Sequence, residues 1–549
     1  MKLKTYIYSV LLAVAFLSVS GCQDFLDSEI NSSITSENFY GNEEDFQAAT
    51  AALYTKVWFD FNDKFYYGLG DGRGFNLYAP YSDYVYPFTD LTASGITGPL
   101  VSAWQALYNV VQQSNRVIKG ITASAATSDE IKNQYIAEAR FMRGTAYTYL
   151  AMLWGNVIIS EDTDALIANP LVNTNPTEDV WEFAIRDFEF AAKHLGATSY
   201  AAGRVNKYSA YGMLSRAYLT FAGYSGDPNS GVRNTQYLDL AKKAAKKVIE
   251  ESNFKLMDNY ADLFEIDNNN NSESMFALQW VSGDASSTHY GVNNSQQAYF
   301  ACGSEITGDD ASWGYWTRAQ PNVIWEYEKG DLRRKATWMA YSDYYPTIQV
   351  SSGGYTYEKT REALNIKKYV CGSSKDHAKI SRMNCPVNTY MLRLAEVYLN
   401  YTEAALGDNA TLSDPVELAY FNAVRARAGL NPVTEIDWDD IRRERRLELC
   451  MEGQYWYDLV RRAYYRQQEM VNYVISQQRD VINPVLWDEA TQTLGIDPDR
   501  DPSSRAIGNV DASIFLLAYP ESETVQNPLL RETPVPYVFT EDKITDLFN

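Results

Sequence analysis

Three stretches of the chain share one pattern of small and aromatic residues, and this pattern restricts the fold more than any other feature. Residues 143–150, 216–219 and 393–399 each place small residues and Tyr or Leu three or four positions apart. On a helix such positions share a face, so small residues on one helix admit aromatic side chains from the next. Each stretch is followed by another amphipathic run, at residues 178–194, 237–251 and 415–428. The pattern predicts an all-α fold of tetratricopeptide-like helix pairs, with a generic helical bundle as the alternative.

Two long segments, residues 59–101 and 265–384, break the helical period. The first is rich in Gly, Tyr and Phe, and the second combines Asn, Gly/Ser pairs and short β-branched runs. Because long loops in a compact protein usually serve a function, we expect ligand-binding insertions with minor β structure. The expected helical core covers mainly residues 43–58, 102–260 and 385–475, and an irregular tail covers residues 476–549. Together these parts are expected to form a single domain that starts at residue 22.

The start of the chain has the pattern of an exported lipoprotein. Lys2 and Lys4 precede an uncharged stretch at residues 7–19, which is too short to cross a bilayer but suits a signal peptide. It ends in Val19-Ser20-Gly21-Cys22, which resembles a bacterial lipobox. We predict a lipoprotein signal peptide over residues 1–21 and lipidation of Cys22, with an ordinary secretory signal as the alternative. The membrane is then contacted only through the lipid anchor.

The acidic composition argues against polyanionic partners. The chain holds 48 Lys and Arg against 70 Asp and Glu, a formal net charge of −22. This charge is a poor electrostatic match for nucleic acid or for an anionic membrane surface. Only three His residues are present, which argues against a His-based metal centre or catalytic triad.

Cysteine spacing and oxygen-rich runs give weaker signals for metals. No Cys-x-x-C motif occurs, which excludes zinc ribbons and thioredoxin-type redox motifs. Cys371 and Cys385 are either a disulfide or a free pair. Two runs, residues 267–273 and 497–501, alternate oxygen ligands but lack the Gly and Glu positions of an EF-hand. We favour solvated turns there and expect no metal or cofactor, with structural calcium as the alternative.

Five ordered motifs resemble those of one protein family. They lie at residues 22–27, 138–144, 392–399, 422–430 and 441–461. The most specific is IRRERRLEL at 441–449, followed by Glu-Gly at 452–453 and Asp-Leu-Val-Arg at 458–461. In this order they resemble the SusD/RagB-like outer-membrane lipoproteins, over most of the chain. Two positions depart from the family's pattern: residues 155–158 lack a proline, and Gln454 stands where Arg often follows Glu-Gly.

The resemblance implies a function as well as a fold. Proteins of this family are non-catalytic, bind oligosaccharide or polysaccharide at the cell surface, and cover a SusC-like TonB-dependent transporter for nutrient import. The resemblance therefore implies an outer-membrane location, lipid-anchored and facing the cell exterior. Two alternatives from other classes are an all-helical glycoside hydrolase and a peptide-binding lid of a peptide importer.

Aromatic residues concentrate in the two insertions. Residues 58–88 contain 12 rings in 31 positions, and residues 299–345 contain 11 in 47. A flat ring presents an apolar face to the C–H face of a sugar, and interleaved polar groups can bond its hydroxyls. Packing of the insertions onto the core is the competing interpretation for each ring. Trp313 and Trp316 are the preferred platform residues. The candidate ligand-binding residues are Asp60, Asn62, Asp71, Arg73, Asn76, Tyr81, Asp83, Tyr84, Tyr299, Cys302, Trp313, Trp316 and Arg318.

One pair of carboxylates invites a catalytic interpretation. Glu444 and Glu448 share a helix face at i,i+4, but Arg442, Arg445 and Arg461 are close in sequence. Arginines keep carboxylates ionised, whereas glycoside hydrolysis needs one acid with a raised pKa. We expect structural ion pairs here, and no catalytic residues.

Overall fold

The computed structural model describes residues 39–282, 293–308, 312–358, 364–380, 384–477, 485–488, 490–491, 493–496, 510–544 and 546–548. The predicted signal peptide, Cys22 and the oxygen-rich run at 497–501 lie outside these residues. A search of the described helices finds none that is both long enough and apolar enough to cross a membrane.

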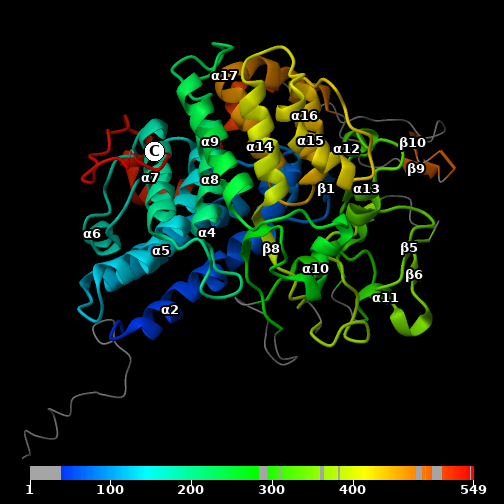
Figure 1. Cartoon of the computed structure of the whole chain (residues 1–549), viewed down its shortest axis with the longest axis horizontal. Helices are drawn as coiled ribbons and strands as arrows, with labels where there is room; N and C mark the ends of the chain where they lie inside the picture. Colours follow the sequence, from blue (N-terminus) through cyan, green and yellow to red (C-terminus); the bar gives the residue numbers. More distant parts are fainter. Residues whose placement is uncertain are drawn as a thin grey trace, which may run out of the picture.

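The core is an array of long helices, each packed on its neighbours (Figure 1). They are α4 (Gly98–Ala123), α5 (Asp129–Trp154), α7 (Thr177–His194), α8 (Lys207–Phe221), α9 (Thr235–Glu251), α14 (Leu394–Leu406), α15 (Pro415–Arg427), α16 (Trp438–Glu448) and α17 (Tyr455–Ser476). α4 packs against α5, α5 against α7, α7 against α8, and α8 against α9. α9 in turn packs against α14, and α14 packs against α15. The prediction of an all-α fold built from packed helix pairs is confirmed.

Small residues allow these helices to approach closely, as their spacing predicted. A Cβ added to Gly144 on α5 would lie 3.0 Å from the Cβ of Asp187 and 3.1 Å from the carbonyl oxygen of Ala184, both on α7. On α8, a Cβ at Gly212 would lie 2.7 Å from a methyl of Leu392 on β8 and 3.3 Å from a methyl of Val397 on α14. Larger side chains at these two positions would push α5 away from α7, and α8 away from β8 and α14.

Polar side chains fix where several helices begin. Ser128 caps α5 by accepting a hydrogen bond from the Ile131 amide. Asn206 and Ser209 form a reciprocal capping box at the start of α8. These caps satisfy amide groups that the first helical turn leaves without a partner.

The N-terminal part of the core differs from the prediction. The helix expected over residues 43–58 is divided into α2 (Glu43–Ala51) and two short 3-10 turns that end at Trp58. Residues 61–65 and 68–72, expected in a loop, form two π-helical turns. Their side chains are largely buried because the rings pack into the core, and a Cβ at Gly70 would lie 2.2 Å from the Gly453 backbone.

Two insertions far apart in the sequence meet through short strands. β1 (Leu77–Tyr78) pairs antiparallel with β3 (Arg318–Ala319), so that Tyr78 lies opposite Arg318. β3 continues to β7 (Asn365–Ile366) and β4 (Trp338–Met339) in one sheet. The other pairs are β2 (Ser274–Leu278) with β8 (Thr389–Arg393), β5 (Tyr344–Tyr345) with β6 (Tyr355–Thr356), and β9 (Val485–Asp488) with β10 (Thr493–Ile496).

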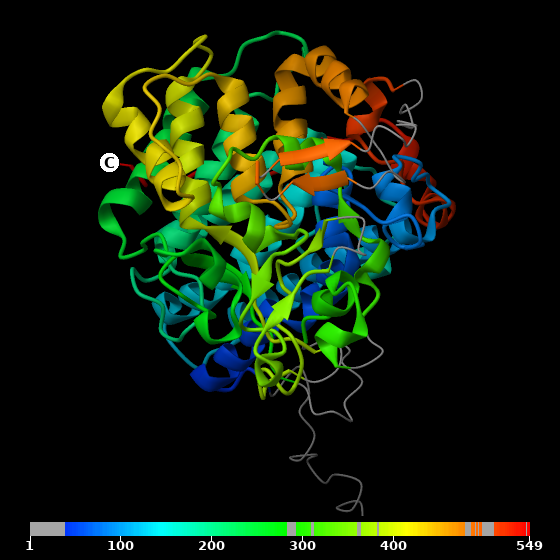
Figure 2. The ribbon, with the colours of Figure 1, turned by 90° about the vertical axis from the view of Figure 1, so that its right-hand side faces the viewer.

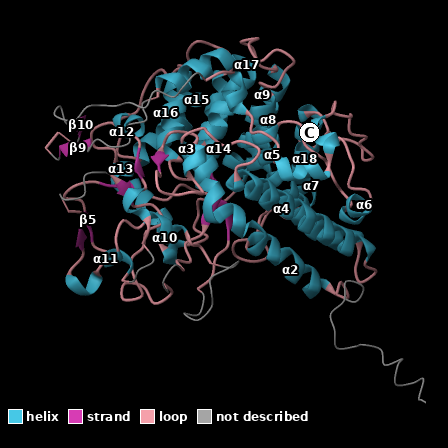
Figure 3. Ribbon diagram, turned by 180° about the vertical axis from the view of Figure 1, so that it is seen from behind, coloured by secondary structure: helices cyan, strands magenta, loops and turns pink. Residues whose placement is uncertain are grey.

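The remaining helices are short and lie mostly in the insertions and the C-terminal tail. They are α3 (Tyr86–Thr89), α6 (Thr163–Ala168), α10 (Gln296–Phe300), α11 (Ser304–Thr307), α12 (Pro321–Trp325), α13 (Leu332–Thr337) and α18 (Glu521–Gln526). Figure 2 looks onto the side that carries the second insertion, with the β9–β10 pair in front of the helices. Figure 3 shows β5, β9 and β10 on the opposite side of the molecule from α6 and α7. The helical array therefore supports the insertions at one end.

Candidate functional site

Exposed aromatic rings gather where the two insertions meet. Tyr81 follows β1 and is 73% exposed, and Trp316 precedes β3 and is 45% exposed. Because β1 pairs with β3, these rings meet edge to face with centroids 5.2 Å apart. Tyr315 meets Trp316 at 4.9 Å, also edge to face. The three rings therefore form one continuous exposed group.

A second aromatic group belongs to the same two insertions. Trp313, 51% exposed, lies 5.4 Å from the ring of Tyr299. The ammonium group of Lys64 lies 4.4 Å from the ring centre of Tyr84 and 5.2 Å from that of Tyr299. Cations at these distances are attracted to ring faces, so Lys64 joins the first insertion to the second. We call Tyr81, Tyr84, Tyr299, Trp313, Tyr315 and Trp316 the aromatic surface.

The loop that carries the tryptophans is held firmly to α10. The Trp313 amide donates to the carbonyl of Ala298 at 2.7 Å, and the Gly314 amide donates to that of Ala301 at 2.9 Å. A Cβ at Gly314 would lie 2.2 Å from the carbonyl oxygen of Phe300. Only glycine permits this approach, so the rings are presented by a fixed backbone.

Three predicted polar residues border the aromatic surface. Asp60 and Asp83 are exposed. Burial around Asp60 raises the pKa of its carboxyl group, and the neighbouring Asp63 raises it further. The Arg318 guanidinium lies 5.3 Å from the ring centre of Trp316. Around the rings there are thus hydrogen-bonding groups of both charge signs.

Asp71, Arg73 and Asn76 lie in the interior. Asp71 accepts hydrogen bonds from the amides of Met451 at 2.8 Å and Gly453 at 2.7 Å, and burial raises its pKa to about 6. Arg73 stacks 4.4 Å from the Trp456 ring centre, and burial lowers its pKa to about 10. The side-chain oxygen of Asn76 accepts from the Nε of Arg446 at 2.8 Å. All three join the first insertion to the rest of the protein, not to a ligand on this surface.

Asn62 and Cys302 are buried as well. The Asn62 side-chain oxygen accepts from Oγ1 of Thr389 at 2.7 Å and from Nε2 of Gln296 at 3.2 Å. Cys302 lies in the hydrophobic core, 1% exposed. We therefore place these two residues, like the previous three, outside the surface that a ligand contacts. Their polar type alone did not distinguish them from exposed loop residues.

Sequence reasoning left out two residues that belong to this surface. Tyr315 stands between Trp313 and Trp316 in the same Gly-containing loop, a signal strong enough to have included it. Lys64 lies in a π-helical turn, and no local pattern indicated that its ammonium would reach two rings.

Glu444 and Glu448 are buried and paired with arginine. Glu444 accepts from Arg333 at 2.6 Å and from Arg425 at 3.3 Å. Glu448 accepts from Arg333, Arg393 and Arg427. Burial opposes its ionisation, but these arginines hold the pKa of Glu448 well below its usual range. Both carboxylates form buried ion pairs, although their partners are not the arginines nearest in sequence. At Glu444, burial outweighs Arg333 and Arg425 and raises the pKa, which differs from the expectation for this pair.

The remaining candidates from the sequence are the oxygen-rich run at residues 267–273, for a metal, and the pair Cys371 and Cys385, for a disulfide. Among the described residues, no group of three or more His, Cys, Asp or Glu side chains is arranged to hold a metal ion. Asp267, in the first oxygen-rich run, pairs with His377 at 3.2 Å. Cys371 and Cys385 are buried free thiols, and a hydrogen bond between them, together with burial, raises the pKa of Cys371.

Comparison with known proteins connects this geometry to a family. The SusD family model matches residues 219–535, and a model described as "Starch-binding associating with outer membrane" matches residues 89–219. A SusD-like protein of Bacteroides ovatus is 38% identical over 552 residues, covering 97% of this chain and 98% of that protein. SusD-like protein P25 of Formosa agariphila is 23% identical over 505 residues, covering 84% and 90%.

Solved structures show the same fold. The protein in a crystal structure with xylogluco-oligosaccharide has 38% sequence identity to this chain. Its TM-score is 0.81, and the match covers 90% of this chain and 100% of that one. A SusD-like carbohydrate-binding protein from Bacteroides fragilis is 22% identical, with a TM-score of 0.70 over 90% of this chain and 100% of that one. At that lower identity the likeness concerns the fold alone.

Proposed function

Because the chain belongs to the SusD family of non-catalytic carbohydrate-binding proteins, we propose that its aromatic surface is where a glycan binds. The observation that carries this assignment is the exposed group of Tyr81, Tyr315 and Trp316, assembled from two distant insertions. Ring faces stack on the C–H faces of sugars, while hydroxyl and indole N–H groups remain available for hydrogen bonds. Asp60, Asp83 and Arg318 add polar partners at the edge.

A neutral oligosaccharide is the ligand that best fits this surface. The rings offer apolar faces, and the net charge of −22 disfavours polyanionic glycans at long range. The relative solved with xylogluco-oligosaccharide shares 38% of its residues with this chain, which makes xyloglucan fragments the first choice of ligand.

The finer part of the proposal concerns delivery. The protein would hold the glycan on the cell exterior, anchored through a lipid on Cys22 at the outer membrane, and pass it to a SusC-like TonB-dependent transporter. Support comes from the lipobox-like residues 19–22 and from the family model whose description names association with the outer membrane. Co-purification from detergent-solubilised outer membranes tests the partnership: a TonB-dependent transporter is expected with the wild-type protein. Its absence under conditions that keep the lipid anchor intact would reject the delivery step.

Affinity electrophoresis in gels containing a glycan panel tests the binding surface. Xyloglucan is expected to retard the protein, and Trp316→Ala and Trp313→Ala are each expected to weaken binding about tenfold, or ~1.4 kcal/mol. The matched control is Trp325→Ala, because Trp325 is 40% exposed on α12 but lies outside the aromatic surface.

Two outcomes would overturn the proposal. If both tryptophan variants migrate like the wild type in every gel that retards it, the glycan binds elsewhere. If the purified protein releases reducing ends from a glycan, the account of a binding protein without catalysis fails.

A further inference from the structure

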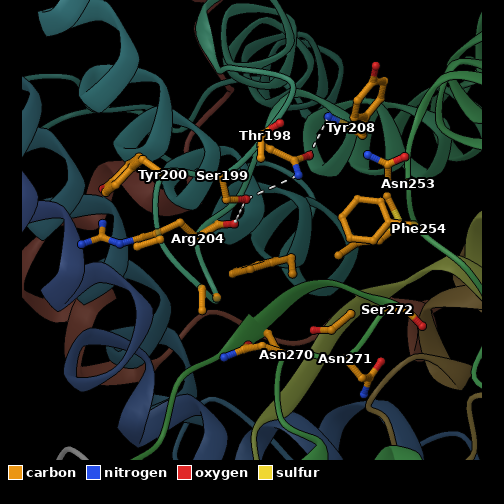
Figure 4. A pocket seen from close by; sticks show the side chains of 18 of the residues that line it. Thr198, Ser199, Tyr200, Arg204, Tyr208, Asn253, Phe254, Asn270, Asn271 and Ser272 are labelled. Atoms are coloured by element: carbon orange, nitrogen blue, oxygen red, sulfur yellow. Dashed lines mark hydrogen bonds between the residues drawn. The ribbon is translucent and has the colours of Figure 1, made fainter.

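A separate hollow lies on the helical array, away from the residues of the aromatic surface. It has a volume of 510 Å³, within the range of sites that bind small molecules. Its walls come from the loop between α7 and α8, the segment after α9, and the residues leading into β2. Figure 4 shows Asn253 and Phe254 on one side of this hollow and Asn270, Asn271 and Ser272 across from them.

The walls of the hollow carry rings as well as polar groups. Tyr200 lies at the left of the view in Figure 4, and Tyr208 and Phe254 lie at the right. Amide and hydroxyl side chains lie between and opposite them, so apolar ring surface and hydrogen-bonding groups occur together. Such a combination suits a small hydroxyl-rich molecule better than a purely apolar one.

Some polar side chains that line the hollow form hydrogen bonds within the protein, and others are available to bind a ligand. The Asn206 side-chain oxygen accepts from the amides of Tyr208 at 2.9 Å and Ser209 at 3.1 Å, and Ser199 donates to the carbonyl of Arg204 at 2.7 Å. By contrast, within the described residues, the side chains of Thr198, Tyr208 and Asn253 make no hydrogen bond. Two hydroxyls and one amide are thus free to bind a ligand.

Among the described side chains that line the hollow there is no unpaired charge, and the Lys207 ammonium lies outside this lining, 5.4 Å from the centre of the Tyr208 ring. Arg204 is the one charged side chain among the described residues that line it. Its guanidinium donates to the Glu138 carboxylate at 3.0 Å, to Oγ1 of Thr50 at 2.8 Å and to the Gln47 carbonyl at 2.8 Å. A charged ligand would find no counter-ion here and would lose its hydration, so a neutral ligand is favoured.

From these observations we infer that the hollow is a second saccharide site, which takes a neutral unit of one or two sugars. It goes beyond the proposed function, because it shares no residue with the aromatic surface and binds its ligand independently. A polysaccharide long enough to reach both places would be held more tightly than at either one, since the second contact becomes intramolecular.

Substitution of Asn253 tests the inference with little risk to the fold. Asn253 is exposed, so Asn253→Ala removes a ligand contact and Asn253→Trp fills the entrance. Each is made in the Trp313→Ala/Trp316→Ala background as well as in the wild type. The probes are xylogluco-oligosaccharide and the charged trigalacturonate, and the measurements are saturation-transfer NMR and crystal soaking. Asn169→Ala and Asn169→Trp are the matched controls, because Asn169 is an exposed residue that ends α6.

The expected result is that the tryptophan double variant still gives saturation transfer to the neutral probe and density in the hollow. Adding Asn253→Trp is expected to abolish both, adding Asn253→Ala to weaken binding severalfold, and the Asn169 changes to leave it unaltered. Absence of binding in the tryptophan double variant, equal binding by the Asn253→Trp variant, or preference for trigalacturonate would each overturn the inference. Loss of binding at the aromatic surface is measured separately, by comparing the wild type with the Trp313→Ala/Trp316→Ala variant, since both proteins keep Asn253.

Discussion

Asp71 and Asp83 belong to the same Gly- and Tyr-rich segment, yet they have different surroundings. Asp83 is exposed beside the aromatic surface, whereas Asp71 is fully buried and accepts amide hydrogen bonds from the turn before α17. Trp316 and Trp456 differ in the same way: one is an exposed ring beside Tyr81, and the other is buried under Arg73. At the residue scale, burial decides which polar and aromatic side chains can meet a ligand.

Asp71 makes the stability of the protein depend on pH. Its folded-state pKa of about 6 lies above the ordinary 3.8 of an unfolded chain, because burial disfavours the charged form. The protonated form is therefore favoured in the folded state, and its stabilising effect, roughly 3 kcal/mol, is lost as pH rises from about 4 through about 6. In urea unfolding from pH 3.5 to 7, the wild type should lose that amount relative to Asp71→Asn. A constant difference between the two proteins across this range would contradict the assignment.

Substitution of Glu448 tests how much the buried ion pairs contribute to the stability of the protein. Its carboxylate accepts from Arg333, Arg393 and Arg427, so Glu448→Gln removes one negative charge that three buried guanidinium groups share. We expect a loss of roughly 3–5 kcal/mol in the free energy of unfolding. Glu469→Gln is the control, because Glu469 pairs with Arg462 near the surface and its loss should cost at most about 1 kcal/mol. Chemical denaturation measures both, and equal stabilities of the two variants would refute a structural role.

At the scale of elements, two residues of β1 and two of β3 decide where the aromatic surface forms. Their pairing joins insertions that are separated by most of the helical core in sequence. The loop after α11 then presents Trp313, Tyr315 and Trp316 from a backbone fixed against Phe300 and Ala301 at the end of α10. The geometry of the surface thus depends on glycine at one position.

Gly314→Ala should weaken glycan binding without unfolding the protein. The new Cβ would meet the Phe300 carbonyl oxygen at 2.2 Å, so the loop must move and the rings on either side of it move with it. Isothermal titration with xylogluco-oligosaccharide should show a loss of about tenfold or more in affinity. Gly226→Ala, where an added Cβ meets no atom within 4 Å, is the matched control. Wild-type affinity in the Gly314 variant would show that the loop does not position the ligand.

The helix pairs were predictable from sequence because their signals are local. Gly144 lies three positions before Tyr147, and Ala395 lies three positions before Tyr398, in two of the stretches that predicted the helices. β1 and β3 were not predictable, since a two-residue strand has no periodicity and exists only through its distant partner. The π-helical turns at 61–65 and 68–72 were missed for a related reason: glycines indicated a loop, while packing against Gly453 selected a helical form.

The candidate site was predictable only in part. Trp313, Trp316 and Tyr81 had a local signal, as rings among Gly and polar residues, and the structure leaves them exposed. Asn62 and Asn76 had the same local signal, but they bond to Thr389 and Arg446, which only the folded chain brings near. Glu444 and Glu448 likewise find most of their arginines on other elements.

At the scale of the whole molecule, the helical array acts as a rigid support for loops gathered at one end. α4 to α9 pack as successive neighbours, and α14 and α15 continue them, while the second insertion lies beside this array (Figure 1). We therefore expect little change of conformation when the proposed glycan binds, because the rings are already positioned. A neutral sugar, the ligand that we propose, carries no charge for the chain's net −22 to repel.

The most direct test of the central claim is a crystal of the protein soaked with xylogluco-oligosaccharide. Sugar density is expected on the exposed faces of Trp316 and Tyr81 or of Trp313, with the glycosidic bonds intact and the loop after α11 unmoved. Sugar density confined to places outside the aromatic surface, or cleaved product at that surface, would contradict the account.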